Sequence, residues 1–263
     1  MKDFNVDLCW FSRLGQQIVY LLNDELKEND RKFIKRAYDM SPKIYMDRLR
    51  AIGFDKHKRV LDAGCGFGQW TICLSELGVN VTSIDISMLR LRGTQMALAE
   101  LGYIAQTAQA NLEAIPLKSN CFDGIFCYGS LFCTPWKESL CEFARILKPG
   151  GYIYFSANEI GYILHMWQKR PNRTGEFDPR ESAVNTFRNT LDYELYGLPP
   201  RNGQILITCD EAKKELQKMG FDLLFLKPEG TLNLVPNKLK PKPFFESEYN
   251  GLPGCYEVLA QKK

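Results

Sequence analysis

Apolar and polar residues occur along the chain in short blocks whose spacing switches between strand-like and helix-like. Residues 59–63 form an apolar run typical of a buried strand, and residues 69–77 follow with helical spacing before Gly78. A second strand at 80–85 is followed by a helix that Ser87 caps and that runs to about residue 101. The pattern predicts strands that alternate with helices.

The same alternation continues through most of the remaining chain. A helix is predicted at 135–147, and Thr208 with Glu211 gives a capping-box pattern at the start of another helix, which Gly220 ends. Parallel strands need crossover connections, and these cover both faces of a sheet. The predicted fold class is therefore α/β, a doubly wound and mostly parallel sheet. The later strands are predicted at residues 104–110, 122–127, 152–156, 221–226 and 256–261.

Two segments depart from this alternation. The stretch SPKIYMDRLRAIG predicts a short helix before the first strand, so residues 1–54 are interpreted as an N-terminal helical cap on a core at 55–263. At 157–204 the alternation is lost and the sequence mixes aromatic, proline and arginine residues, which indicates an insertion after the fifth strand. The stretch KLKPKPFF near residue 240 predicts an extended, exposed connection.

Composition narrows the class of protein. The 263 residues are 45% hydrophobic and 25% charged, as in globular domains, and no window approaches the roughly 18 apolar residues of a membrane span. Asp3 and Asp7 do not suit a secretory signal, so we expect a cytoplasmic protein. Nine cysteines and two histidines lack zinc-ligand spacing, so no metal is expected. The net charge of +3, with acids among the basic residues, predicts no nucleic-acid partner.

The stretch VLDAGCGFGQW carries the first candidate chemistry. Gly64, Gly66 and Gly68 follow a predicted strand and precede a helix, which allows a tight turn and close approach of a ligand to the backbone. A turn without any ligand is the alternative. Asp85 ends the second strand, 21 positions after Gly64, where a carboxylate can accept hydrogen bonds from a ribose. Alternatively, Asp85 is only a polar residue before the next helix.

Two further passages favour a nucleoside ligand. ANLEAIPLKSNCFDGIF and ARILKPGGYIYFS, together with VLDAGCGFG and the acidic end of the second strand, resemble the class I S-adenosylmethionine-dependent methyltransferases in order and spacing. The resemblance covers roughly residues 60–156 and is nearest to the branch that methylates small molecules. It implies S-adenosyl-L-methionine as cofactor and transfer of its sulfonium methyl to an oxygen, nitrogen or carbon nucleophile.

The resemblance also assigns roles to residues near the first two strands. It implies that Gly64, Gly66 and Gly68 lie along the methionine part of the cofactor and that Asp62 ties down their loop. Asp85 would hold the ribose, and Ile86 would press on the adenine.

The third and fourth strands are assigned roles in the same way. The family commonly has an acidic residue after the third strand, whereas this chain has Asn111, whose amide oxygen can still accept a hydrogen bond, followed by Leu112. Tyr128 follows the fourth strand, where the family places residues that touch cofactor and substrate. Packing under the sheet edge is the alternative for Tyr128.

A substrate pocket is expected where the N-terminal helices and the insertion meet above the carboxyl ends of the strands. Their aromatic residues suit an apolar cover that excludes water, although they could equally bury themselves in a second small core. Transfer of a sulfonium methyl needs few catalytic residues, because the methyl group is already electrophilic. His165 is the candidate if a general base is required. The pocket candidates are Tyr38, Tyr45, Asn158, Tyr162, His165 and Trp167.

Three other functions stay open at this point. A nicotinamide oxidoreductase is disfavoured because the glycine spacing is G-x-G-x-G and no Tyr-x-x-x-Lys pair occurs. A nucleic-acid or protein methyltransferase is disfavoured by the modest charge and by the lack of the Asn/Asp-Pro-Pro-aromatic signature after the fourth strand. A non-catalytic binding module would keep the same motifs. The oligomeric state cannot be read from the sequence.

Overall fold

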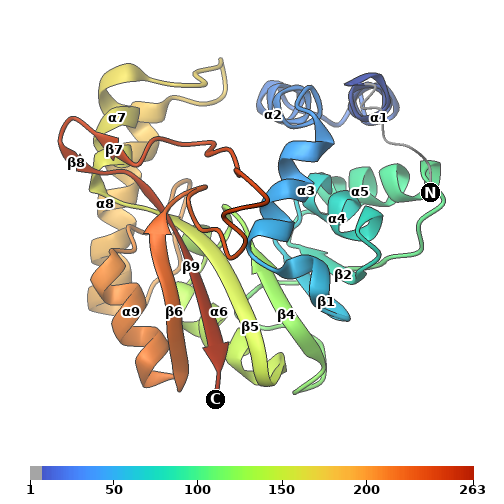
Figure 1. The fold of residues 1–263 in the computed structure, drawn as a ribbon. Helices are drawn as coiled ribbons and strands as arrows, with labels where there is room; N and C mark the ends of the chain where they lie inside the picture. Colours follow the sequence, from blue (N-terminus) through green and yellow to red (C-terminus); the bar gives the residue numbers. More distant parts are fainter. Residues whose placement is uncertain (1–7) are drawn as a thin grey trace.

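A seven-stranded sheet lies at the centre of the computed structural model, which describes residues 8–263 (Figure 1). The strands follow the order β3-β2-β1-β4-β5-β9-β6. β9 is antiparallel to β5 and β6, and the other neighbouring strands are parallel. The predicted α/β fold is therefore confirmed. The strands are β1 (Arg59–Ala63), β2 (Asn80–Asp85), β3 (Gln106–Gln109), β4 (Phe122–Cys127), β5 (Leu147–Asn158), β6 (Phe221–Pro228) and β9 (Cys255–Lys262).

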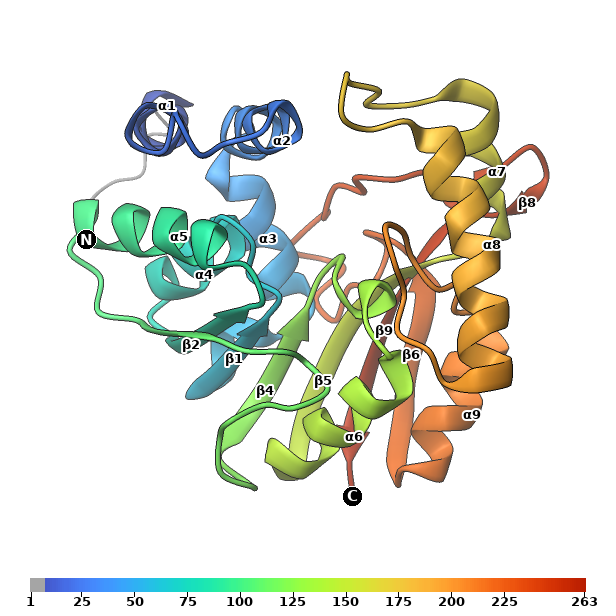
Figure 2. The same ribbon diagram turned by 180° about the vertical axis from the view of Figure 1, so that it is seen from behind.

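Helices cover both faces of the sheet, as the two opposite views show (Figures 1 and 2). One face packs against α4 (Gln69–Glu76) and α5 (Met88–Glu100), and the other against α6 (Trp136–Ile146) and α9 (Cys209–Lys218). Successive β1 side chains point to opposite faces, so Val60 joins the first core and Leu61 the second. Burial on both faces explains why the strands read as continuous apolar runs.

Four strand predictions differ from the structure in length, and the differences are largest for β3 and β5. β3 covers only Gln106–Gln109, because Ile104 lies fully exposed beyond the sheet. β5 begins at Leu147, five residues before the predicted strand, because Leu147 already pairs with Phe122 ahead of a shift in register. At the carboxyl ends the differences are smaller, with β3 ending at Gln109 instead of Ala110 and β5 at Asn158 instead of Ser156.

Within residues 8–58, three α-helices precede the first strand: α1 (Leu8–Leu21), α2 (Glu28–Tyr38) and α3 (Pro42–Ala51). A 3-10 turn, η1 (Phe54–Lys56), links them to β1. Their buried side chains belong to the same core cluster as α4 and α5. The helical cap is therefore continuous with the core, and its boundary at residue 54 stays a prediction. The acidic residues Asp3 and Asp7 lie outside the described residues.

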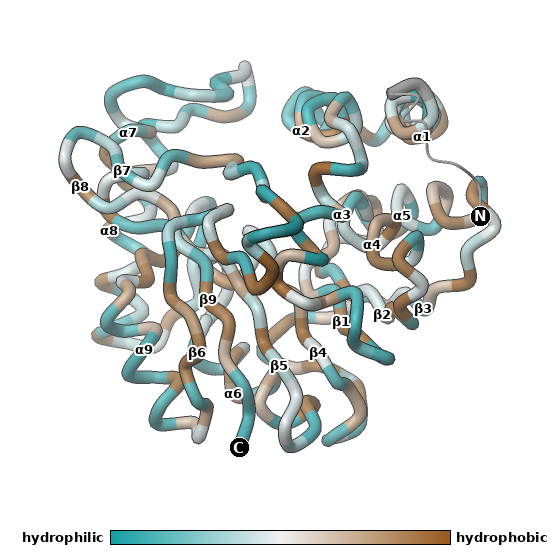
Figure 3. Tube along the Cα trace, viewed as in Figure 1, coloured by the Kyte–Doolittle hydropathy of each residue, from teal (hydrophilic) through white to brown (hydrophobic). Residues whose placement is uncertain are grey.

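The predicted insertion contains two helices, α7 (Ile160–Lys169) and α8 (Pro179–Tyr196), joined by residues 170–178. We call residues 170–178 the insertion tip. In Figure 1 the tip extends from the top of α7 towards α2, and in Figure 3 it is mostly hydrophilic. The insertion leaves the carboxyl end of β5, as expected from the sequence.

A long segment between β6 and β9 returns across the same end of the sheet. This segment, residues 229–254, is called the strap, and it contains the short pair β7 (Glu248–Tyr249) and β8 (Leu252–Pro253). It is largely exposed, as KLKPKPFF predicts, but Phe244 turns inward against Trp70 and Tyr128. From residue 8 onward, no helix is long and apolar enough to cross a membrane.

Candidate functional site

The loop between β1 and α4 contains three glycines in the left-handed region of backbone space. The φ angles of Gly64, Gly66 and Gly68 are +77°, +58° and +89°, values that residues with a side chain rarely adopt. A Cβ atom on Gly64 would lie 2.3 Å from Oγ of Ser130, whereas one on Gly66 would meet no atom within 4 Å. The loop therefore closes against Ser130 on one side and leaves bare backbone open at Gly66.

Asp85 joins this glycine loop to the end of β2. Its Oδ2 accepts a hydrogen bond from the Gly66 amide at 2.9 Å, and its Oδ1 accepts one from the Ser87 amide at 2.8 Å. The side chain is only 5% exposed. Each carboxylate oxygen has a second lone pair, so both can still accept a hydrogen bond from a ligand. Asp85 therefore lies directly beside the open backbone of Gly66.

Asp62 lies beneath the loop and is buried. It accepts a hydrogen bond from the Thr71 hydroxyl at 2.6 Å, and Thr71 also contacts Ser83 of β2 at 2.9 Å. Burial raises the pKa of Asp62 to about 7, and the Thr71 hydrogen bond opposes the rise. Asp62 thus fastens α4 to β1 at the base of the loop.

The residues expected around the adenine gather beside Asp85. Ile86 is 67% exposed at the end of β2, and its carbonyl accepts a hydrogen bond from Gln109 of β3 at 2.9 Å. The Ala110 amide donates to the Asp85 carbonyl at 3.1 Å, which brings the segment after β3 to the same edge. Asn111 is exposed there, while Leu112 is buried in the core. Ile86 and Asn111 are open to a ligand, and Leu112 is a packing residue beneath them.

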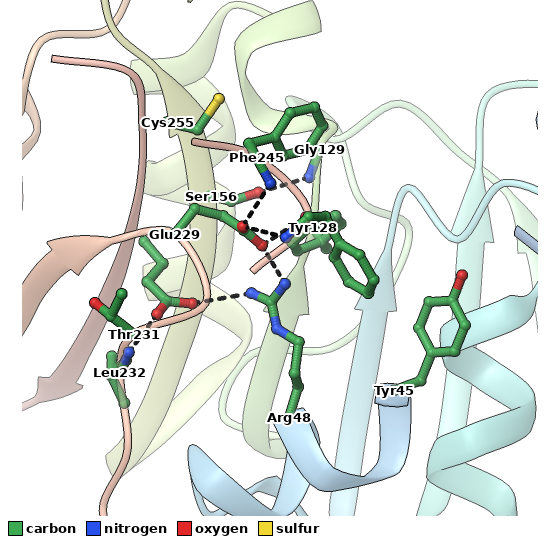
Figure 4. A network of polar contacts seen from close by, with 12 residues as sticks. Tyr45, Arg48, Tyr128, Gly129, Ser156, Glu229, Thr231, Leu232, Phe245 and Cys255 are labelled. Atoms are coloured by element: carbon green, nitrogen blue, oxygen red, sulfur yellow. Dashed lines mark hydrogen bonds and ion pairs between the residues drawn. The ribbon is translucent and has the colours of Figure 1, made fainter. Parts of the chain in front are cut away.

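Tyr128, after β4, takes part in a buried polar network (Figure 4). Its hydroxyl donates to Oε1 of Glu229 in the strap at 2.8 Å, and the Arg48 guanidinium lies 5.2 Å from its ring centroid. Arg48 also forms ion pairs with Glu229 and Glu257, and all three side chains are at most 3% exposed. Tyr128 is half-buried and packs within this network, and its contact with cofactor or substrate stays a prediction.

This network was not predicted from the sequence. Arg48 of α3 and Glu257 of β9 are 209 positions apart, and no short motif links them. Glu257 also accepts a hydrogen bond from Tyr154 at 2.6 Å, and burial raises its pKa. The two amides of Phe244 and Phe245 donate to Oε2 of Glu229. The network therefore joins the strap to α3 and to the end of β4.

Two of the predicted pocket residues are buried supports instead, which corrects the prediction. Tyr38 is 1% exposed, and its hydroxyl donates to the Phe67 carbonyl in the glycine loop at 2.6 Å. Tyr45 is 4% exposed, and its hydroxyl donates to the Ala37 carbonyl at 2.9 Å. A buried tyrosine needs a partner for its hydroxyl, and backbone carbonyls provide it here. Both rings support the loop and α2 from beneath.

The other pocket candidates lie in or near the insertion. Asn158 donates to Gln204 at 2.8 Å and accepts a hydrogen bond from the Cys255 thiol at 3.1 Å, which fixes the base of the insertion. Tyr162 and His165 pack against the strap, with the His165 ring 4.3 Å from that of Tyr249. Trp167 is 46% exposed and lies under the Arg180 guanidinium. Tyr162 and His165 therefore belong to one aromatic cluster, and Trp167 stands apart from it.

α2 and the insertion tip meet above the carboxyl ends of the strands, at the top of Figure 1. The Thr174 hydroxyl donates to Asn29 at 2.6 Å, and the Gly175 amide donates to Glu28 at 3.1 Å. Arg36 donates to the Asn172 side chain at 2.8 Å. Segments more than 130 residues apart in the sequence therefore touch, and together with the strap we call them the roof.

Comparison with known proteins decides the family. Residues 61–155 match the family model described as "Methyltransferase domain". The chain is 32% identical over 196 residues to the ubiquinone biosynthesis O-methyltransferase of Ralstonia nicotianae, a match that covers 68% of this chain and 82% of that protein. The chain belongs to the class I S-adenosylmethionine-dependent methyltransferases. The family prediction, and with it the cofactor, is confirmed.

Other relatives of this methyltransferase match shorter stretches. The malonyl-[acyl-carrier protein] O-methyltransferase of Pectobacterium atrosepticum is 31% identical over 144 residues, which cover 51% of this chain and 54% of that protein. The match thus spans about half the length of that curated relative. Among solved structures, a geranyl diphosphate methyltransferase in complex with S-adenosylmethionine has a TM-score of 0.57 at 14% identity, with 84% of each chain covered. That likeness concerns the fold.

The residues of the site fit S-adenosylmethionine. Gly66 offers bare backbone with open space above it, and Asp85 lies next to it with acceptor capacity to spare. Oε1 of Gln69, the first residue of α4, is buried without a hydrogen-bond partner among residues 8–263, so it can accept from a ligand. The sequence reasoning missed Gln69, although its place directly after the glycine motif was a usable signal. Glycine loop, Asp85 and Gln69 would hold the cofactor.

Proposed function

We propose that this methyltransferase acts on a small molecule, and that the roof encloses that molecule above the glycine loop. The observation that carries the proposal is the contact between α2 and the insertion tip, at Asn29–Thr174 and Arg36–Asn172. A covered site suits an acceptor that is small enough to be enclosed. The relatives named for ubiquinone biosynthesis and for malonyl-[acyl-carrier protein] support an acceptor of this class.

The cofactor, when bound, supplies a methyl group on a positively charged sulfur that is already strongly electrophilic. The chain then has three tasks: to hold the acceptor in line with that group, to exclude water, and to accept a proton where the acceptor loses one. Tyr128 packs against Phe244 and Tyr162 against Phe245, so these rings would give the cover an aromatic inner surface. His165 is the candidate base for a hydroxyl or ammonium acceptor, and its packing against Tyr249 holds its ring in place.

The site residues that we propose are those that the structure brings to one edge. Gly64, Gly66, Gly68 and Asp85 would contact the methionine and ribose parts of the cofactor, with Ile86 and Asn111 beside the adenine. Tyr128 would border both ligands. Which nucleophile receives the methyl group is the finer part of the proposal, and oxygen is favoured by the names of the relatives.

The test is a transfer assay with S-adenosylmethionine that carries a tritiated methyl group. The purified chain is incubated with cell extract that has been separated into small-molecule, protein and nucleic-acid fractions. We expect label in the small-molecule fraction and none above background in the other two. Label in RNA, DNA or protein would overturn the choice of acceptor class. If the labelled fraction is a nucleic acid, its affinity for the chain should fall steeply as the salt concentration rises.

A further inference from the structure

Arg36 lies at the seam where α2 meets the insertion tip. Its Nη1 donates to the side-chain oxygen of Asn172 at 2.8 Å, and its guanidinium lies 5.7 Å from the ring centroid of Phe33. The Phe33 ring is 6.2 Å from that of Phe67, which belongs to the glycine loop. A cation is therefore held two ring contacts away from the cofactor loop, on the side that faces the insertion.

No carboxylate within residues 8–263 forms an ion pair with Arg36, and the same holds for Arg31 of α2, which donates to Asn23. The contacts of Arg36 are the neutral amide of Asn172 and the ring of Phe33. Four other cations on α2 and on the insertion tip are paired with acids. These ion pairs are Lys32–Glu28, Lys35–Asp39, Arg170–Asp178 and Arg173–Asp178.

The charge of Arg36 also reaches across the roof to α7. Burial raises the pKa of Tyr162, and the positive charge of Arg36 acts in the opposite direction on the same hydroxyl. Tyr162 packs against Phe245 of the strap. The apolar surface that the guanidinium contacts is the Phe33 ring.

We propose that Arg36 binds an oxyanion of the methyl acceptor, so that the acceptor is an anionic molecule with an apolar body. A guanidinium presents a planar fork that matches a carboxylate or a phosphate with two parallel hydrogen bonds. With one nitrogen on Asn172, Arg36 keeps other donors for such a group. Phe33 is the apolar wall beside the guanidinium. This inference rests on the proposed function, because it assigns a part of the same acceptor site.

The test measures anion selectivity with defined probes. The chain is first saturated with S-adenosylhomocysteine, and benzoate, phenyl phosphate and uncharged benzamide are then titrated by calorimetry. We expect one of the two anions to bind about tenfold more tightly than benzamide, which is the effect of one charge-assisted contact. The stronger of the two anions distinguishes a carboxylate from a phosphate.

Three variants separate anion binding from a structural role. Arg36→Gln should bring the anion and benzamide affinities to within about twofold of each other, because only the charge-assisted part is lost. Lys35→Gln, the preceding cation on the same helix, and Asn172→Ala, which removes the seam hydrogen bond, should both keep the preference. Equal affinities in the unaltered chain, no anion binding, or a preference that survives in Arg36→Gln would each overturn the inference. Failure of S-adenosylhomocysteine itself to bind would count against the proposed function instead.

Discussion

Asp62 and Asp85 stand near the carboxyl ends of neighbouring strands, and each supports the glycine loop in a different way. Asp62 is buried and bonded to Thr71, so it acts on the position of α4. Asp85 is bonded to the Gly66 and Ser87 amides, so it shapes the loop where the backbone is open. The sequence placed both residues near the site, because the motif fixes the first and the strand end fixes the second. It could not show that Asp85 already holds two amides, since that depends on the fold of the loop.

Replacement of Asp85 by alanine should weaken cofactor binding. The change removes the proposed ribose acceptor and frees the Gly66 amide, so we expect a loss of about 1 to 3 kcal/mol in the binding free energy of S-adenosylhomocysteine. Calorimetry measures it. Asp222→Ala, at an exposed site on β6, is the matched control and should leave the affinity unchanged. An unaltered affinity in Asp85→Ala would remove this residue from the cofactor site.

Asp62 should make stability depend on pH. Its pKa is about 7 in the folded chain and near 3.8 when unfolded, so the folded state retains the proton more strongly. Its contribution to stability is therefore complete below pH 3.8 and is lost as pH rises through about 7. Asp62→Asn, which is uncharged, should become more stable relative to the unaltered chain between pH 5 and 8. Urea unfolding at pH 5 and pH 8 measures the free energy of unfolding of both proteins. The same difference between them at the two pH values would contradict this prediction.

At the scale of elements, the roof is made of three segments that the sequence revealed to different degrees. The insertion was predicted from the break in alternation, and its helices α7 and α8 occupy the expected place. The sequence predicts the strap only as an extended connection, because its inward contacts, such as Phe244 with Tyr128 and Glu229 with Arg48, join residues far apart in the chain. Long-range ion pairs leave no local pattern, so sequence reasoning could not find them.

Removal of Arg48 should destabilise the fold strongly. Arg48→Met keeps an unbranched apolar stem but leaves the Glu229 and Glu257 carboxylates buried without their partner, which typically costs about 3 to 5 kcal/mol. Chemical denaturation measures the change in unfolding free energy. The comparison is Arg92→Met, which breaks a half-exposed pair with Glu25 and should cost less than about 1 kcal/mol. Similar costs for the two variants would show that the buried network contributes no more than a surface pair.

Opening the seam should separate cofactor binding from methyl transfer. Replacement of residues 172–175 by a glycine-serine linker removes the contacts with Glu28, Asn29 and Arg36 while α7 and α8 remain. Affinity for S-adenosylhomocysteine should change less than about twofold, and transfer to the native acceptor should fall by about tenfold or more, because water enters and the acceptor is less well held. As a control, the same linker in place of residues 237–240 of the strap should leave transfer intact. Full transfer with an open seam would contradict the role of the roof.

At the scale of the whole molecule, the fold follows from the sequence more fully than the acceptor site does. Alternating blocks are local signals, and the crossover rule turns them into a parallel sheet whose carboxyl ends carry the cofactor motifs. The proposed acceptor site instead depends on contacts between segments far apart in the chain, such as the one between Asn29 and Thr174. Tyr38 and Tyr45 show that aromatic content alone does not identify pocket residues. Both rings are packed in the core, and their hydroxyls donate to backbone carbonyls.

The identity of a methylated product tests the central claim most directly. The chain and S-adenosylmethionine are incubated with a small-molecule extract, and mass spectrometry compares the mixture with one that contains Gly66→Val, whose branched side chain would fill the open space at a left-handed residue. We predict that one compound is consumed only with the unaltered chain, that a product one methyl group heavier replaces it, and that S-adenosylhomocysteine forms in equal amount. Bound S-adenosylmethionine that is never converted to S-adenosylhomocysteine with any small-molecule fraction would contradict the account.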